Sequence, residues 1–125
     1  MTVPHRDDRG VAVVWALTLV SLLLLVGVVS SGVAALAVAR QRVAAVADIA
    51  ALAAAQALWD PCGRAAQVAG QNAMAVVACS PDGIDVVVEV SAPAPAMVIR
   101  LLGVLGRPVG DVRATARAGA PTPLD

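Results

Sequence analysis

The sequence predicts an α+β protein in which one long N-terminal helix crosses a membrane and continues into a small domain. Three features predict this class. The residues from Val11 to Ala39 include no charged side chain, and the Ala-rich stretch that follows contains neither Gly nor Pro before Trp59. Beyond Met74, two segments alternate between apolar and polar residues, as half-buried strands do.

The uncharged segment is long enough to span a bilayer. A hydrocarbon core of about 30 Å needs about 20 apolar helical residues, and the 29 residues from Val11 to Ala39 form a helix of about 43 Å. The alternative, a helix buried in a soluble domain, needs more surrounding protein than a chain of 125 residues provides. We therefore expect a single-pass membrane protein.

The amphipathic stretch after Ala39 extends this helix. Val43, Val46, Ile49 and Leu52 recur every three residues, and Ala, the residue with the highest helix propensity, fills most other positions. Pro61 cannot continue a helix and disfavours helical backbone in the residue before it. One continuous helix is therefore expected from Val11 to about Leu58.

The remaining chain predicts a short helix and about three antiparallel strands. The helix is expected over Gly63–Ala73, and a hairpin follows, with its turn at Ser80–Gly83. In its second strand Ile84, Val86, Val88 and Val90 fall on one face, and a third strand is expected over Asp111–Ala118.

The segment Met97–Leu105 is apolar but too short to span a bilayer as a helix, so a packing helix, a strand and a surface in contact with lipid remain open. The expected organisation is a cytoplasmic leader, a transmembrane segment, an extramembrane continuation of the helix, a small extracytoplasmic domain and a loose tail, over residues 1–10, 11–39, 40–60, 61–118 and 119–125.

Cys62 and Cys79 enclose 16 residues, and both follow the apolar segment. A disulfide between them would stabilise so small a domain by about 3 kcal/mol and would place it outside the cytoplasm. Two unrelated reduced thiols are the alternative. No metal site is expected, because the only histidine, His5, precedes the span and no tetrahedral ligand set exists.

The sequence contains no motif of an enzyme or a cofactor site. It has no nucleophile motif, phosphate-binding loop or dinucleotide fingerprint. Asp85 and Glu89 lie about 13 Å apart along one strand face, too far for paired acid–base work, and are expected in a solvated surface. The formal net charge of zero and the aromatic content of 2% exclude nucleic acid as a partner. We expect a non-enzymatic protein without cofactors.

Several segments together resemble the actinobacterial TadE/TadG-like proteins, small membrane proteins related to the minor pilins of tight-adherence (Flp) pilus systems. These are the leader DRG, the extension from Arg40 to Leu58, the two cysteines and the closing DVRATARAG. The resemblance implies a pilin-like fold and a component of a Flp/Tad-type pilus or of a type II/IV-like secretion system, with other pilin-like or secretion-system proteins as partners.

The resemblance also implies a processing site. A prepilin peptidase cuts after a Gly that precedes the apolar helix, and here that residue is Gly10, so the mature chain would begin at Val11. Pilins tend to carry a Glu at the fifth mature position, where this chain has Trp15. Trp15 fits an anchor at the membrane interface instead.

Within the span, small residues at helical spacing predict a surface for lateral helix packing. Gly27, Ser31 and Ala35 follow one another in four-residue steps, which lets a second helix approach closely in lipid. Arginines flank both ends of the span almost equally, so orientation rests on the cysteines and the short leader, which favour a cytoplasmic N-terminus and an extracytoplasmic C-terminal domain in the cell membrane.

Two other interpretations remain open. Signal peptidase sites of the small-x-small pattern occur at Ala35–Ala37 and Ala37–Ala39, and cleavage there would release a secreted binding or effector protein. Alternatively, the chain stays uncut in the membrane and acts as an adaptor that recruits a partner through Met97–Leu105.

Overall fold

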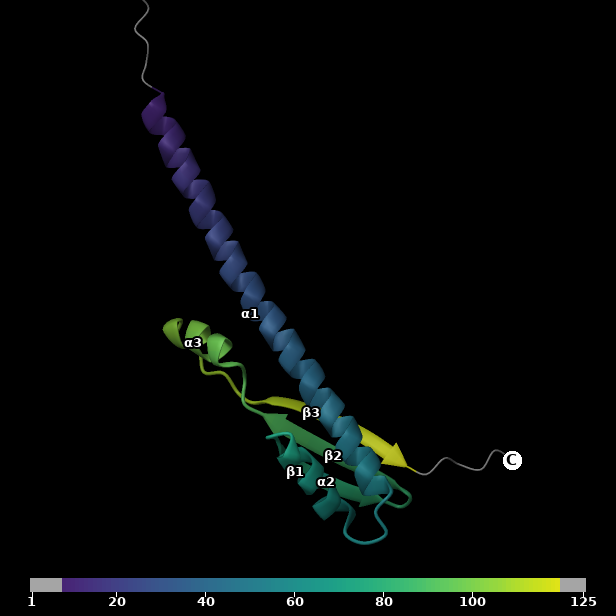
Figure 1. The fold of residues 1–125 in the computed structure, drawn as a ribbon. Coiled ribbons are helices and arrows are strands. Elements are labelled where there is room, and N and C mark those ends of the chain that lie inside the picture. Colours follow the sequence, from purple (N-terminus) through teal and green to yellow (C-terminus); the bar gives the residue numbers. More distant parts are fainter. Residues whose placement is uncertain (1–7, 120–125) are drawn as a thin grey trace, which may run out of the picture. The chain divides into compact units, whose positions relative to one another are not determined.

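The computed structural model describes residues 8–119 of the chain. His5 and most of the expected leader and tail lie outside the described residues. The described chain is α+β, as predicted, with one long apolar helix and a small sheet (Figure 1). Its elements are α1 (Arg9–Ala55), α2 (Pro61–Gln71), β1 (Ala75–Asp82), β2 (Asp85–Ala92), α3 (Ala96–Val104) and β3 (Val112–Gly119). The chain divides into two units, Met1–Ala34 and Ala35–Asp125, each described here by itself.

The continuous N-terminal helix predicted from the sequence is confirmed as α1. It ends at Ala55, earlier than the expected Leu58. Beyond Ala55 the backbone hydrogen bond spans three residues instead of four, since the Ala57 N–H donates to the Ala54 carbonyl oxygen at 3.1 Å. Leu58 consequently lies outside the helix and is exposed.

The second helix begins and ends earlier than predicted. It begins earlier because Pro61 lies in its first turn, whereas the prediction used Pro61 only as the end of the previous helix. The Asp60 carboxylate accepts a hydrogen bond from the Gly63 N–H at 2.9 Å, and Pro61 occupies the first turn, where no N–H is needed. At the other end Ala73 adopts a φ of 56°, and the Met74 N–H donates to the Ala69 carbonyl. This left-handed cap closes α2 before the expected Ala73.

The predicted three-stranded antiparallel sheet is confirmed, with strand order β1–β2–β3. The hairpin turn differs from the prediction: β1 continues through Pro81 to Asp82, and the loop consists of Gly83 and Ile84. Gly83 has a φ of 63°, the conformation that a type II′ turn requires at its first loop residue. Ile84 therefore lies in the loop and is exposed, not on the apolar strand face.

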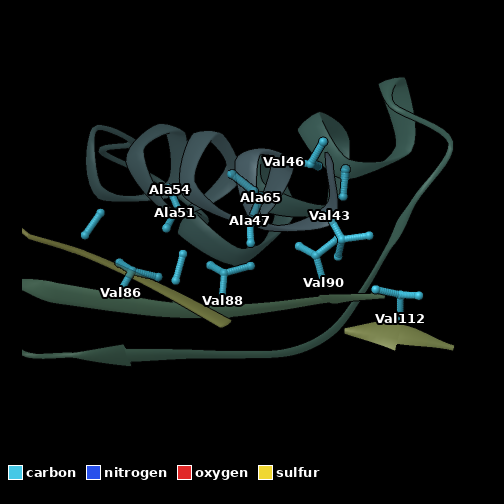
Figure 2. Close-up of a cluster of buried hydrophobic side chains, with 14 of the residues drawn as sticks. Val43, Val46, Ala47, Ala51, Ala54, Ala65, Val86, Val88, Val90 and Val112 are labelled. Atoms are coloured by element: carbon cyan, nitrogen blue, oxygen red, sulfur yellow. The ribbon is translucent and has the colours of Figure 1, made fainter. Parts of the chain in front are cut away.

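The core of the second unit forms between one face of the sheet and the C-terminal part of α1. Val86, Val88 and Val90 alternate along β2 and are buried, as the sequence predicted. Figure 2 shows Val43 of α1 beside Val90, and Ala51 and Ala54 above Val86. In this unit α1 therefore runs antiparallel to β2.

The buried face of α1 differs from the predicted one. Val43 and Val46 are buried, but Ile49 and Leu52 are more than half exposed, and the core positions are taken by alanines. A step of three residues advances about 300° around a helix, so three steps place Leu52 about 180° from Val43. The helix buries positions at its true period instead, and these are Val43, Val46, Ala47, Ala50, Ala51 and Ala54.

The packing of the alanine face against the sheet can be tested by enlarging one of its side chains. Replacing Ala51, which has no exposed surface, by Leu forces extra volume between helix and sheet, and we expect unit 35–125 to lose about 1–3 kcal/mol of stability. Amide hydrogen exchange of β2 in the full-length protein measures this loss. The matched control is Ala45→Leu on the exposed face of the same helix, for which exchange should stay unchanged. Equal effects of both variants would contradict this packing.

The apolar segment left open by the sequence is a helix, α3, in the connection between β2 and β3. Val98 is buried and Leu102 is half-buried, one turn further along the helix. Alternation in the third strand also agrees with prediction, since Arg113, Thr115 and Arg117 are exposed while Val112 and Ala116 are buried.

Candidate assembly surfaces

The first unit presents apolar side chains on every side of α1. Its large hydrophobic residues are exposed throughout, from Val11 to Val33, and Leu23 and Leu24 reach 71% and 67%. A helix that is apolar on all faces is found in the core of a large protein or in a membrane. The helix Gly10–Ala55 is long and apolar enough to cross a membrane, as the sequence predicted.

Three of the four hydroxyl side chains between Val11 and Ala34 are hydrogen-bonded within the helix. The hydroxyl groups of Thr18, Ser21 and Ser31 each donate to the carbonyl oxygen four residues earlier at 2.8 Å. A hydroxyl without a partner is costly in hydrocarbon. These three residues therefore add little to the cost of placing α1 in lipid.

The proposed packing residues lie on exposed or partly exposed surface. Gly27 and Ser31 are exposed in the first unit, and a Cβ added at Gly27 would meet no atom within 4 Å. Ala35 is half-buried and begins the second unit. Because the Ser31 hydroxyl donates to the Gly27 carbonyl, this surface offers a helix partner close backbone approach rather than a free hydrogen-bond donor.

The candidate processing site lies at the beginning of α1. The helix starts at Arg9, so the bond between Gly10 and Val11 falls in the first turn, where the Ala12 N–H donates to the Asp8 carbonyl oxygen at 3.1 Å. Peptidases act on extended backbone, so cleavage here requires that turn to open. Opening is inexpensive at a helix end.

Cys62 and Cys79 form a disulfide in the structure, with Cα atoms 5.8 Å apart. The bond joins the first turn of α2 to β1. In α2 only Ala65 and Ala69 are fully buried, and a helix of 11 residues is marginal without tertiary support. The disulfide therefore adds a covalent link to the packing of Ala65, Ala69 and Val68 against the core.

The sheet face opposite α1 carries charged pairs. Arg117 contacts Asp85 at 2.8 Å and Asp82 at 3.1 Å, and Arg113 lies 3.7 Å from Glu89. The two acidic residues predicted to be solvated are thus each paired with an arginine from β3. Exposed pairs of this kind contribute at most about 1 kcal/mol, and they join β3 to β2 and to the end of β1.

Several apolar residues of the second unit are exposed, and of these the sequence pointed only to those of Met97–Leu105. On α1 these are Ile49 and Leu52, and beyond its end they are Leu58 and Trp59. On and just after α3, Met97, Ile99, Leu101, Val104 and Leu105 are exposed. The true helical period would have identified Ile49 and Leu52, because at about 100° per residue they lie about 120° and 180° around the helix from Val43.

Within residues 8–119, no three His, Cys, Asp or Glu side chains gather as a metal site would require. The surfaces that the structure offers are the exposed helix and the apolar residues of the second unit. Comparison of the chain with protein-family models, with curated proteins and with solved structures gives no match.

Proposed function

We propose that the chain is a single-pass protein of the cell membrane that works by assembling with other membrane proteins. The observation that carries the proposal is the first part of α1, whose large apolar side chains are exposed and in which Thr18, Ser21 and Ser31 donate their hydroxyl groups to the helix's own carbonyl oxygens. Water is a poor solvent for such a helix, whereas lipid is a good one. Residues 11–34 supply most of the span.

The N-terminus lies in the cytoplasm, and the disulfide-bonded domain lies outside it. The bond between Cys62 and Cys79 supports this orientation, because disulfides persist in oxidising compartments and are rare in the cytosol.

The function is non-enzymatic assembly in a Flp/Tad-type pilus or a type II/IV-like secretion system, as the resemblance to TadE/TadG-like proteins implies. The partners are other pilin-like or secretion-system proteins, and a prepilin peptidase cuts between Gly10 and Val11. A pilin-like organisation is supported by a helix that continues from an apolar segment into the core of a small sheet domain.

Lateral packing of α1 is the proposed mechanism of assembly, and it is tested by enlarging its smallest side chains. In Gly27→Leu/Ser31→Leu, two bulky side chains block close helix approach, and self-association or capture of a partner helix in vesicles should fall at least about tenfold. Energy transfer between labelled copies measures association. The control Val29→Leu/Val33→Leu has the same spacing on the opposite side of α1. Association that survives the first variant would contradict the mechanism.

Release by signal peptidase is the second candidate, and two contacts argue against it. Leu36 and Ala39 pack against the core of the second unit. Cleavage after Ala37 would remove the first contact, and cleavage after Ala39 would remove both. An adaptor that is not cut at Gly10 keeps both contacts.

A further inference from the structure

The second unit carries a short helix with more apolar surface than its own packing uses. Val98 of α3 is buried and Leu102 is half-buried, and the other large apolar side chains remain exposed. Val104 and Leu105 are 87% and 68% exposed. Exposing this apolar surface to water is unfavourable, which indicates that another molecule covers it.

The position of α3 within the unit identifies the occupant. Because α1 runs antiparallel to β2, the end of β2 that leads to α3 is the end at which α1 enters the unit. The loop of Gly83 and Ile84 lies at the other end of the sheet. Figure 1 shows α3 and this β1–β2 loop at opposite ends of the strands.

The length of the apolar helix places this entrance at lipid depth. From Val11 to Ala34 the helix is about 36 Å long, longer than the hydrocarbon core of about 30 Å and shorter than the 40–45 Å that includes both headgroup layers. When Val11 lies at the inner boundary of the core, Ala35, the first residue of the second unit, lies among the outer headgroups.

The charges of α3 and of the loop that follows it are basic. This stretch has two arginines, Arg100 and Arg107, while the nearest acidic residues in the chain are Glu89, which pairs with Arg113, and Asp111. Both arginines are exposed, and neither belongs to an ion pair within residues 8–119. Basic residues next to exposed apolar ones are typical of helices that lie in the interface of membranes with anionic lipids.

We propose that α3 and Leu105 form a membrane-interface anchor that embeds its apolar side chains between the headgroups of the lipid leaflet from which α1 emerges. This inference rests on the proposed span of α1 and adds a second contact with the same leaflet. The second unit is thereby held against the membrane, and the apolar side chains of α3 leave the water.

Brominated lipids, which quench nearby tryptophans, test the anchor. The full-length chain is reconstituted into vesicles of phosphatidylcholine and phosphatidylglycerol brominated near the top of the acyl chains. In the background Trp15→Phe/Trp59→Phe, the reporters Ile99→Trp and Leu101→Trp occupy exposed α3 sites. We expect each to lose more than about half of its emission, since interfacial helices bury about 5–10 Å deep.

Two controls separate this anchor from the span. Ile84→Trp in the same background reports the far end of the sheet and should keep its emission. Trp59→Phe retains Trp15, whose quenching tests whether α1 is in the bilayer. If Trp15 is quenched while both α3 reporters respond no more than Ile84→Trp, the anchor is wrong and the span stands. If Trp15 is also unquenched, the proposed membrane span itself fails, and the anchor fails with it.

Discussion

Replacing Leu23 and Leu24 by arginine is expected to remove the chain from the membrane. Both residues lie near the middle of the apolar part of α1 and are exposed. Each arginine at the centre of a spanning helix costs about 2.5–3.5 kcal/mol, so the pair shifts the equilibrium between inserted and uninserted chain more than about 1,000-fold. The carbonate-resistant fraction after synthesis in the presence of membrane vesicles measures this shift.

The matched control places the same two charges on the same helix outside the proposed span. Ile49→Arg/Leu52→Arg introduces arginines at two exposed apolar positions of the second unit, where they face water, and membrane retention should equal that of the parent. Retention of the Leu23→Arg/Leu24→Arg chain at the parental level would show that α1 does not depend on lipid.

Removing the disulfide is expected to loosen α2 and β1 without changing the membrane helix. In Cys62→Ser/Cys79→Ser the unfolded chain regains the freedom of a closed loop, and the second unit loses about 3 kcal/mol. Because about 1.4 kcal/mol corresponds to a factor of ten, amide exchange in α2 and β1 should accelerate about 100-fold. Hydrogen exchange of the full-length protein in lipid, read by mass spectrometry, measures it.

The same exchange experiment contains its own reference. Amides of residues 11–34 belong to the other unit, and their exchange should be equal in the parent and in the double serine variant. Reduction of the parent protein should reproduce the variant. Unchanged exchange in α2 after loss of the bond would mean that Ala65 and Ala69 alone hold this helix.

The long helix and the sheet could be predicted because their signals are distributed over many residues. The prediction of an apolar helix from Val11 to Ala39 does not depend on any single residue, and the alternation in β2 and β3 extends over whole strands. Patterns of this kind survive local irregularities. The strand order β1–β2–β3 then follows from short connections between antiparallel neighbours.

The buried face of α1 could not be predicted from its largest residues. Ile49 and Leu52 suggested an apolar stripe, whereas the core uses alanines such as Ala47, Ala50 and Ala54. In a helix so rich in Ala, the side chains alone do not distinguish core from surface. A strict period of 3.6 residues would have favoured the alanine face.

Local chemistry explains the remaining errors at the ends of elements. Asp60 and Pro61 resemble a helix stop, but the carboxylate caps the following helix and the proline begins it. The turn consists of Gly83 and Ile84 and not of Ser80–Gly83, because Gly83 tolerates a positive φ. The packing surface at Gly27 and Ser31 is different in kind, since a pattern of small residues describes how a helix can be approached but does not identify its partner.

The N-terminal sequence and intact mass of the protein, recovered from the membranes and the medium of the cells that produce it, decide whether it works from the membrane. We expect a chain in the membrane fraction that begins at Val11 and retains the whole apolar part of α1. An intact N-terminus in the membrane would leave the membrane span in place but rule out processing at Gly10. A soluble chain that begins at Val38 or Arg40 would show that the proposed function is wrong, because the apolar segment would then have served only as a signal for export.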